Sequence, residues 1–275
     1  ALKVKFYRLV FCIFCRRKEL IKICKVFGGG GLILGLIVGI FGTKIVDHIG
    51  ANKTKEAYTA QIQKAESETK SLKEQLAGSR EEIEKKIAAA DWNMILVNEE
   101  FPLSKDFKVD LDTLDGEYKA DKRIVKDAKA MIAAAAKEDL NLVVQSAYRD
   151  ESKQTSVFEQ TMETLVENGS SYLDAYDEAK KSVNLPGNSE HATGLALDIV
   201  SDTYTDLDEK FADTDEGKWL AAHCAEYGFI LRYPKGKEDI TGITYEPWHF
   251  RYVGTDMAKE LTDKGITLEE YYGLN

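Results

Sequence analysis

The apolar segment 195–200, at the end of the stretch 188–200, holds a single carboxylate, Asp198. The stretch places His191 and Asp198 seven residues apart, with Gly194 between them. Residues 195–200 are apolar apart from Asp198, which is typical of a short buried strand. Burying a carboxylate is costly unless a metal ion, an arginine or a bound proton compensates for its charge. The chain must therefore fold so that one of these three reaches Asp198.

A second stretch, 245–254, supplies another histidine and another acid among aromatic residues. His191, Asp198 and His249 would form a mononuclear site of two imidazoles and one carboxylate, which leaves one position on a zinc ion open for water. Glu246, three residues before His249, could act as a general base on that water. The sequence thus predicts one zinc ion in a catalytic site, because a closed structural site needs no base.

Other pairings stay open at this point. Asp198 could instead form a salt bridge with Arg149 or Arg251. The two remaining histidines are weaker ligand candidates, because His48 lies near the end of an apolar N-terminal segment and His223 lies within a predicted helix.

The two stretches carry a resemblance to a known family. The pattern Ser-x-His-x-x-Gly-x-Ala-x-Asp, followed later by Glu-Pro-Trp-His-Phe-Arg-Tyr-Val-Gly, resembles the VanY-type D-alanyl-D-alanine carboxypeptidases. These are zinc peptidases of the LD/DD-carboxypeptidase group, which trim peptidoglycan stem peptides. The resemblance runs from Trp92 to the C-terminus. It implies the fold shared by hedgehog proteins and zinc DD-peptidases, an α+β domain with a small antiparallel sheet.

The resemblance also implies roles for residues outside the metal set. Arg149 matches an arginine that lines the site, where it could clamp a terminal carboxylate or stabilise the developing oxyanion. Gln145 and Ser189 are candidates for hydrogen bonds to the substrate backbone. Trp248 is expected to shape the pocket, although packing in the core is an equal interpretation.

The charge distribution separates the N-terminus from the rest of the chain. The formal net charge is −10, yet residues 1–25 carry eight Lys/Arg against one Glu, so residues 26–275 carry −17. Nucleic-acid binding rewards clustered cations, so the acidic remainder argues against a nucleic-acid partner.

The N-terminal pattern predicts an anchor and a stalk. Residues 1–25 form a basic leader, and 26–43 are free of charge and match the lower end of membrane-spanning length. A signal peptide is the rival interpretation, but no cleavage signal follows. The cation excess places the N-terminus in the cytoplasm and the domain outside a bacterial cell membrane. Residues 44–90 predict a helical stalk with a thin heptad pattern, and we expect at most a weak dimer through anchor or stalk.

Residues 91–275 are expected to form the zinc carboxypeptidase domain. Helices and strands are mixed there without a βαβ rhythm, which predicts an α+β fold. We expect a strand or extended arm at 94–97, helices at 121–138, 151–167, 171–183, 214–228 and 265–272, and strands at 142–147, 229–232 and 244–253.

The expected activity is removal of a C-terminal D-alanine from a stem peptide, as a DD- or an LD-carboxypeptidase. Two alternatives remain: a non-catalytic wall-binding module on the same fold, and an endopeptidase that cuts stems or cross-bridges.

Overall fold

The computed structural model describes residues 52–274, and the chain divides between Ser79 and Arg80 into two units. The predicted leader (1–25) and anchor (26–43) lie outside the described residues. Within the described range, no helix combines the length and apolar character needed to cross a membrane. The described part of the predicted stalk (44–90) is helical, because α3 runs over Asn52–Ala88. Ile62, Leu72 and Leu76 are exposed on α3, whereas Ile83, near its C-terminal end, is partly buried and packs against a hydrophobic cluster.

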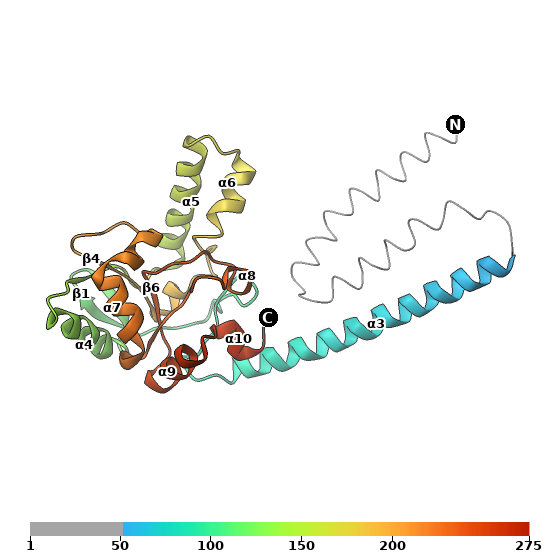
Figure 1. Ribbon diagram of the computed structural model, residues 1–275, viewed down its shortest axis with the longest axis horizontal. Helices are drawn as coiled ribbons and strands as arrows, with labels where there is room; N and C mark the ends of the chain where they lie inside the picture. The colour runs from blue at the N-terminus through green and yellow to red at the C-terminus, as the bar shows by residue number, and fades with distance from the viewer. Residues whose placement is uncertain (1–51, 275) are drawn as a thin grey trace. The chain divides into compact units, whose positions relative to one another are not determined.

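The second unit is an α+β domain with two antiparallel sheets (Figure 1). Its strands are β1 (Leu111–Asp115), β2 (Tyr118–Asp121), β3 (Leu142–Ser146), β4 (Ala196–Ser201), β5 (Phe229–Leu231) and β6 (His249–Tyr252). Its α-helices are α4 (Val125–Ala136), α5 (Glu151–Glu167), α6 (Tyr172–Ala179), α7 (Asp215–His223), α8 (Glu238–Thr241), α9 (Thr255–Lys264) and α10 (Leu268–Tyr272). Short 3₁₀ turns are η1 (Glu190–Thr193), η2 (Glu209–Asp213) and η3 (Cys224–Tyr227).

The larger sheet has the strand order β3-β4-β6-β5, with every neighbouring pair antiparallel. Its register places Asp198 of β4 directly opposite His249 of β6. Residues directly opposite each other point to the same face of a sheet. Leu197 and Phe250, each one residue away, therefore point to the other face.

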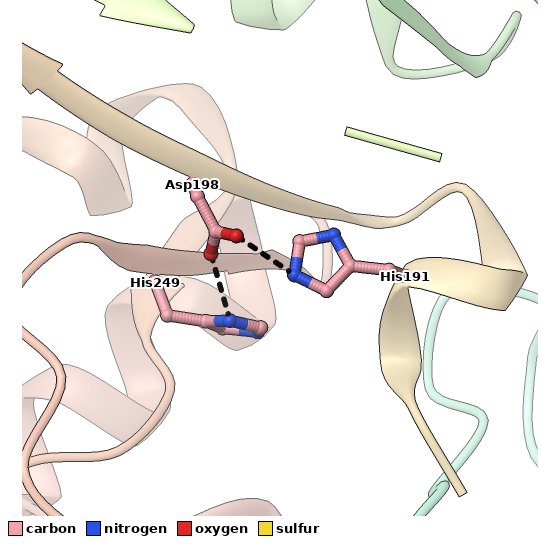
Figure 2. A group of neighbouring side chains, drawn as sticks. All are labelled: His191, Asp198 and His249. Atoms are coloured by element: carbon pink, nitrogen blue, oxygen red, sulfur yellow. Dashed lines mark ion pairs between the residues drawn. The ribbon is translucent and has the colours of Figure 1, made fainter. Parts of the chain in front are cut away.

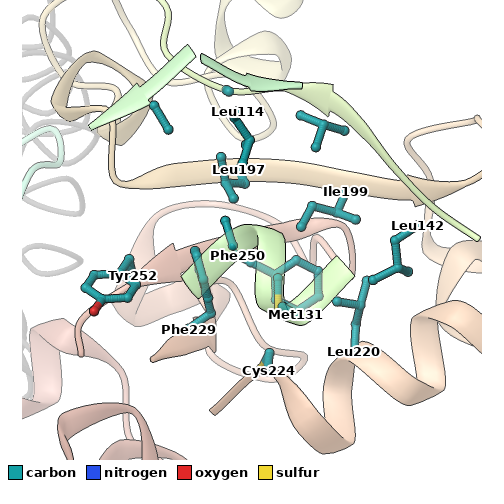
Figure 3. Packing of buried hydrophobic residues seen from close by; sticks show 14 of the residues in the cluster. Leu114, Met131, Leu142, Leu197, Ile199, Leu220, Cys224, Phe229, Phe250 and Tyr252 are labelled. Atoms are coloured by element: carbon teal, nitrogen blue, oxygen red, sulfur yellow. The ribbon is translucent and has the colours of Figure 1, made fainter. Parts of the chain in front are cut away.

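That other face is the main hydrophobic core (Figure 3). Leu197, Ile199 and Phe250 of the sheet are fully buried there against Met131 of α4 and Leu220 of α7. One strand pair thus presents an apolar face to the helices and a polar face to the site, which explains how a carboxylate is tolerated in an apolar strand.

A second cluster packs the C-terminal helices against the edge of the domain. Leu261 of α9 and Leu268 of α10 are buried with Ile230 of β5 and with Met94 and Leu96 of the segment before β1. We expected a strand or an extended arm at 94–97. The segment is an extended arm, because it pairs with no strand in the described part of the chain.

Several expected boundaries were wrong. The strand expected at 244–253 begins only at His249, because Glu246-Pro247-Trp248 form a turn. The helix expected from 121 begins at Val125, because β2 continues to Asp121. The hairpin β1–β2 and the helix α9 were not expected. The helix expected at 265–272 is shorter, because Thr267 caps α10 with a capping box that includes Glu270.

Candidate metal and catalytic site

Three side chains from three elements converge on one point (Figure 2). His191 lies on η1, Asp198 on β4 and His249 on β6. Asp198 Oδ2 lies 3.2 Å from His191 Nε2, and Asp198 Oδ1 lies 3.1 Å from His249 Nδ1. One potential ligand atom from each residue lies within 4.8 Å of the other two. The structure therefore brings the three predicted ligands together in a group that fits a single cation.

The donor atoms of this group favour a metal ion. Within residues 52–274, neither His191 Nε2 nor Asp198 Oδ1 has a hydrogen-bond partner, although both atoms are buried. His191 Nδ1 donates to the carbonyl of Ala147 at 2.7 Å, which fixes the tautomer and leaves Nε2 free as a ligand. Two nitrogens and one carboxylate are a donor set that suits zinc and leaves a coordination position open.

The electrostatics of the metal-free site couple the three groups. Burial and the nearby charge of Arg149 lower the pKa of His191 to about 4. Burial alone would lower the pKa of His249, but the carboxylates of Asp198 and Glu190 raise it to about 9. Burial opposes ionisation of Asp198, yet the two imidazoles outweigh it and hold the pKa of Asp198 well below its usual range. Without a cation, the proton on His249 thus balances the buried Asp198.

Glu246 lies beside the group because of the turn that precedes β6. The His249 amide donates to the Glu246 carbonyl at 3.2 Å, and Glu246 Oε2 lies 3.6 Å from His249 Nδ1. The carboxyl group is buried, and burial raises the pKa of Glu246 to about 8. A carboxyl group with a pKa near neutrality, next to the candidate metal atoms, is suited to proton transfer.

Arg149 reaches the site from the segment after β3. Its Nη1 lies 3.7 Å from Asp198 Oδ2, and its side chain is 17% exposed, so it is not fully enclosed by the protein. This position agrees with both interpretations of Arg149, as a residue that lines the site and as an ion-pair partner of Asp198. The alternative pairing of Asp198 with Arg251 was wrong, because Arg251 bonds Glu190 instead.

The three predicted substrate-contact residues differ in their surroundings. Gln145 is exposed and lies where the β3–β4 register shifts. Ser189 is buried directly before η1. Trp248 is partly buried and packs against the main core, which agrees with the interpretation of Trp248 as a core residue. Tyr252, on the same strand as His249, belongs to the core and donates to Asp127 at 2.8 Å.

A buried ion network next to the site was not predicted. Glu190, directly before the candidate ligand His191, is fully buried and accepts hydrogen bonds from Arg232 and Arg251. Arg232 also donates twice to Glu269 of α10. A sequence signal existed: Arg251 is two residues from His249 and so shares its face of β6. His223, one of the two weaker ligand candidates, is partly exposed and contacts Glu226.

Comparisons with known proteins identify the family to which the chain is related. The family model described as D-alanyl-D-alanine carboxypeptidase, VanY, matches residues 117–255. YodJ of Bacillus subtilis, named as a carboxypeptidase, is 40% identical over 190 residues, which cover 65% of this chain and 66% of its own length. A D-alanyl-D-alanine carboxypeptidase of Enterococcus faecalis is 34% identical over 181 residues, 66% of each chain. The bifunctional dipeptidase and carboxypeptidase VanXYC of Enterococcus gallinarum is 37% identical, over 64% of this chain and 92% of its own.

Solved structures show the same relationship. The VanY D,D-pentapeptidase from a VanB-type cassette, solved in complex with Zn(II), is 34% identical with a TM-score of 0.61, over 66% of this chain and 99% of that chain. The LD-carboxypeptidase LdcB, at 38% identity, has a TM-score of 0.58 over 66% of this chain and 87% of that chain. The relatives thus include both DD- and LD-carboxypeptidases, and the chain is a member of the VanY family of D-alanyl-D-alanine carboxypeptidases.

Proposed function

We propose that the chain is a zinc metallocarboxypeptidase that removes a C-terminal D-alanine from peptidoglycan stem peptides. The observation that carries the proposal is the convergence of His191, Asp198 and His249, with Glu246 3.6 Å from His249. His191 Nε2, an Asp198 oxygen and His249 Nδ1 would hold one zinc ion. The VanY D,D-pentapeptidase solved in complex with Zn(II) supports the metal, and the LD-carboxypeptidase LdcB, solved for peptidoglycan recognition, supports the substrate class.

The bound ion would supply Lewis-acid chemistry, which lowers the pKa of water and polarises a carbonyl group. Glu246 would take a proton from the attacking water as its oxygen bonds to the scissile carbonyl carbon. The same carboxyl group would then deliver that proton to the amine nitrogen as the C–N bond breaks and D-alanine leaves. Positive charge at the site favours the ionised form of Glu246, which is the form that acts as a base.

Arg149 is the residue that would meet the negative charge of the substrate. Its guanidinium is held near Asp198 and is partly exposed, so it can bind a terminal carboxylate in bidentate fashion or contact the developing oxyanion. A preference for a C-terminal residue follows from the first of these two roles. Gln145 and Ser189 are proposed to bond the peptide backbone, and Trp248 to border the pocket.

We also propose that residues 26–43 anchor the chain in a bacterial cell membrane, with the catalytic domain outside. The support is the cation excess of residues 1–25 followed by an uncharged apolar stretch. An enzyme acting on the wall would then stand off the membrane on the helix α3. Protease protection of the leader in sealed vesicles, together with cleavage of the domain from outside, is the expected result.

The test of the activity uses stem pentapeptide and tetrapeptide with zinc and with chelator. The expected product is free D-alanine from one of the two, lost on chelation. Glu246→Gln should lower kcat about 10²–10⁴-fold while the chain still binds one zinc ion. Undiminished turnover in this variant would refute the assigned base. Binding of the stem without any product would indicate the wall-binding module. Release of a C-terminal fragment larger than one alanine would indicate an endopeptidase.

A further inference from the structure

Four charged side chains form a buried chain between the site and the C-terminal helix. They are Glu190, Arg232, Arg251 and Glu269, and each is at most 2% exposed. Glu190 Oε1 accepts from Arg232 Nε at 2.8 Å and from Arg251 Nη1 at 2.7 Å. Arg232 donates to both oxygens of Glu269, at 2.9 and 2.7 Å. Buried charges are tolerated only when paired and hydrogen-bonded in this way.

Both arginine contacts of Glu190 use the same oxygen, and its second oxygen faces the metal site. Glu190 Oε2 lies 3.8 Å from His249 Nε2. Among the residues that the structure describes, neither of these two buried atoms has a hydrogen-bond partner. The other ring nitrogen of His249, Nδ1, faces Asp198. The imidazole thus lies between two carboxylates, one in the candidate ligand group and one outside it.

We propose that Glu190 is a positioning residue for the metal: its Oε2 accepts the Nε2–H of His249 and so holds Nδ1 toward the ion. The inference rests on the proposed metal site. Histidine ligands generally donate their second N–H to a carboxylate or carbonyl, which fixes the tautomer and the ring orientation. His191 has such a partner in the Ala147 carbonyl, and Glu190 is the matching partner for His249.

The two arginines explain why Glu190 can serve in this role. Arg232 and Arg251 both donate to Oε1, so this oxygen is held by two guanidinium groups while Oε2 stays on the side of His249. A carboxylate paired in this way accepts hydrogen bonds at both oxygens. Arg251 is itself anchored by the backbone carbonyls of Asn93 and Ile95, at 3.1 and 2.7 Å, so Glu190 is held from the side opposite His249.

Glu190→Gln tests this role, and Glu269→Gln is the matched control. Both substitutions remove one negative charge from the same guanidinium of Arg232 at a buried position, and no contact joins Glu269 to His249 in the described part of the chain. A glutamine has one acceptor oxygen, which cannot serve both the guanidinium groups and the imidazole. Zinc affinity would be measured for the full chain by competition with a chelator, and folding by circular dichroism.

We expect Glu190→Gln to weaken zinc binding about 10–100-fold and Glu269→Gln to leave it within about threefold. Equal affinity in Glu190→Gln and wild type, or equal losses in the two variants, would overturn the positioning role. Wild type that binds no zinc would instead overturn the proposed function, so the two failures are distinguishable.

A measurement on the unaltered protein covers the case in which Glu190→Gln does not fold. Long-range ¹H–¹⁵N spectra of the zinc-loaded chain report which ring nitrogen of each histidine carries a proton. The expected result is a proton on Nε2 of His249 and on Nδ1 of His191. A proton on Nδ1 of His249 would place Nε2 on the metal and refute the role of Glu190.

Discussion

Gly194 lies between two candidate ligands, and its replacement by alanine should destabilise the domain by a predictable amount. Its φ of +73° is in the left-handed region, which costs a residue with a Cβ roughly 1–2 kcal/mol. A Cβ built there would lie 2.8 Å from the backbone nitrogen of Asp121 and 3.1 Å from Val109 Cγ2. Asp121 also donates its amide to the Gly194 carbonyl at 3.0 Å, so β2 cannot move away without losing that bond.

Overpacking of this kind costs about 1–3 kcal/mol, so Gly194→Ala should lose about 2–5 kcal/mol in total. Gly242→Ala is the matched control: its φ is +75°, and among the described residues no atom lies within 4 Å of the added methyl. The control should therefore lose only the backbone part, about 1–2 kcal/mol. Urea unfolding of both variants in chelator measures the free energies of unfolding without a contribution from metal. Equal losses in the two variants would refute the steric argument.

Three further predictions follow from burial and charge. His249 has a pKa of about 9 without metal, so zinc must displace its proton. Because of this group, the affinity for zinc should rise about tenfold per pH unit up to about pH 9 and then level off. Chelator competition measures the profile, and a flat zinc affinity between pH 6 and 8 would contradict the prediction. Phe229→Ala should lower the free energy of unfolding by about 3–5 kcal/mol, whereas Leu173→Ala, at an exposed position, should change it by about 0.5 kcal/mol or less. Burial raises the pKa of the Cys224 thiol to about 12, so this thiol should react slowly with a thiol reagent at pH 8 in the folded chain and rapidly in urea. The measurement uses a variant in which Cys12, Cys15 and Cys24 are replaced by serine. Fast reaction under both conditions would show that Cys224 is accessible in the folded chain.

The sequence was informative where local signals decide the structure. The helix expected at 151–167 has the bounds of α5, because Asp150 caps its first turn and Asn168-Gly169 end it. The hairpin β1–β2 was missed because β1 is mostly exposed and neither strand has a clear apolar alternation, although Asp115-Gly116 is a turn signal.

At the site, residues within two short motifs could be predicted to meet, and their meeting is what the structure shows. Their roles as ligands and base remain predictions. The environment of Glu190 could not be predicted, because its partners Arg232 and Arg251 lie 42 and 61 residues further along the chain. A buried glutamate and a surface glutamate look alike in sequence, and only the pairing of β4, β5 and β6 distinguishes them.

The pairing of Asp198 with His249 across β4 and β6 has a consequence for how this region can change in evolution. Sliding either strand by one residue would turn Leu197 or Phe250 toward the polar face and bring the carboxylate into the apolar interior. Insertions or deletions of a single residue within these strands should therefore abolish the cation site and the core together. The connection at 202–208, which precedes η2, can vary in length without altering that alignment.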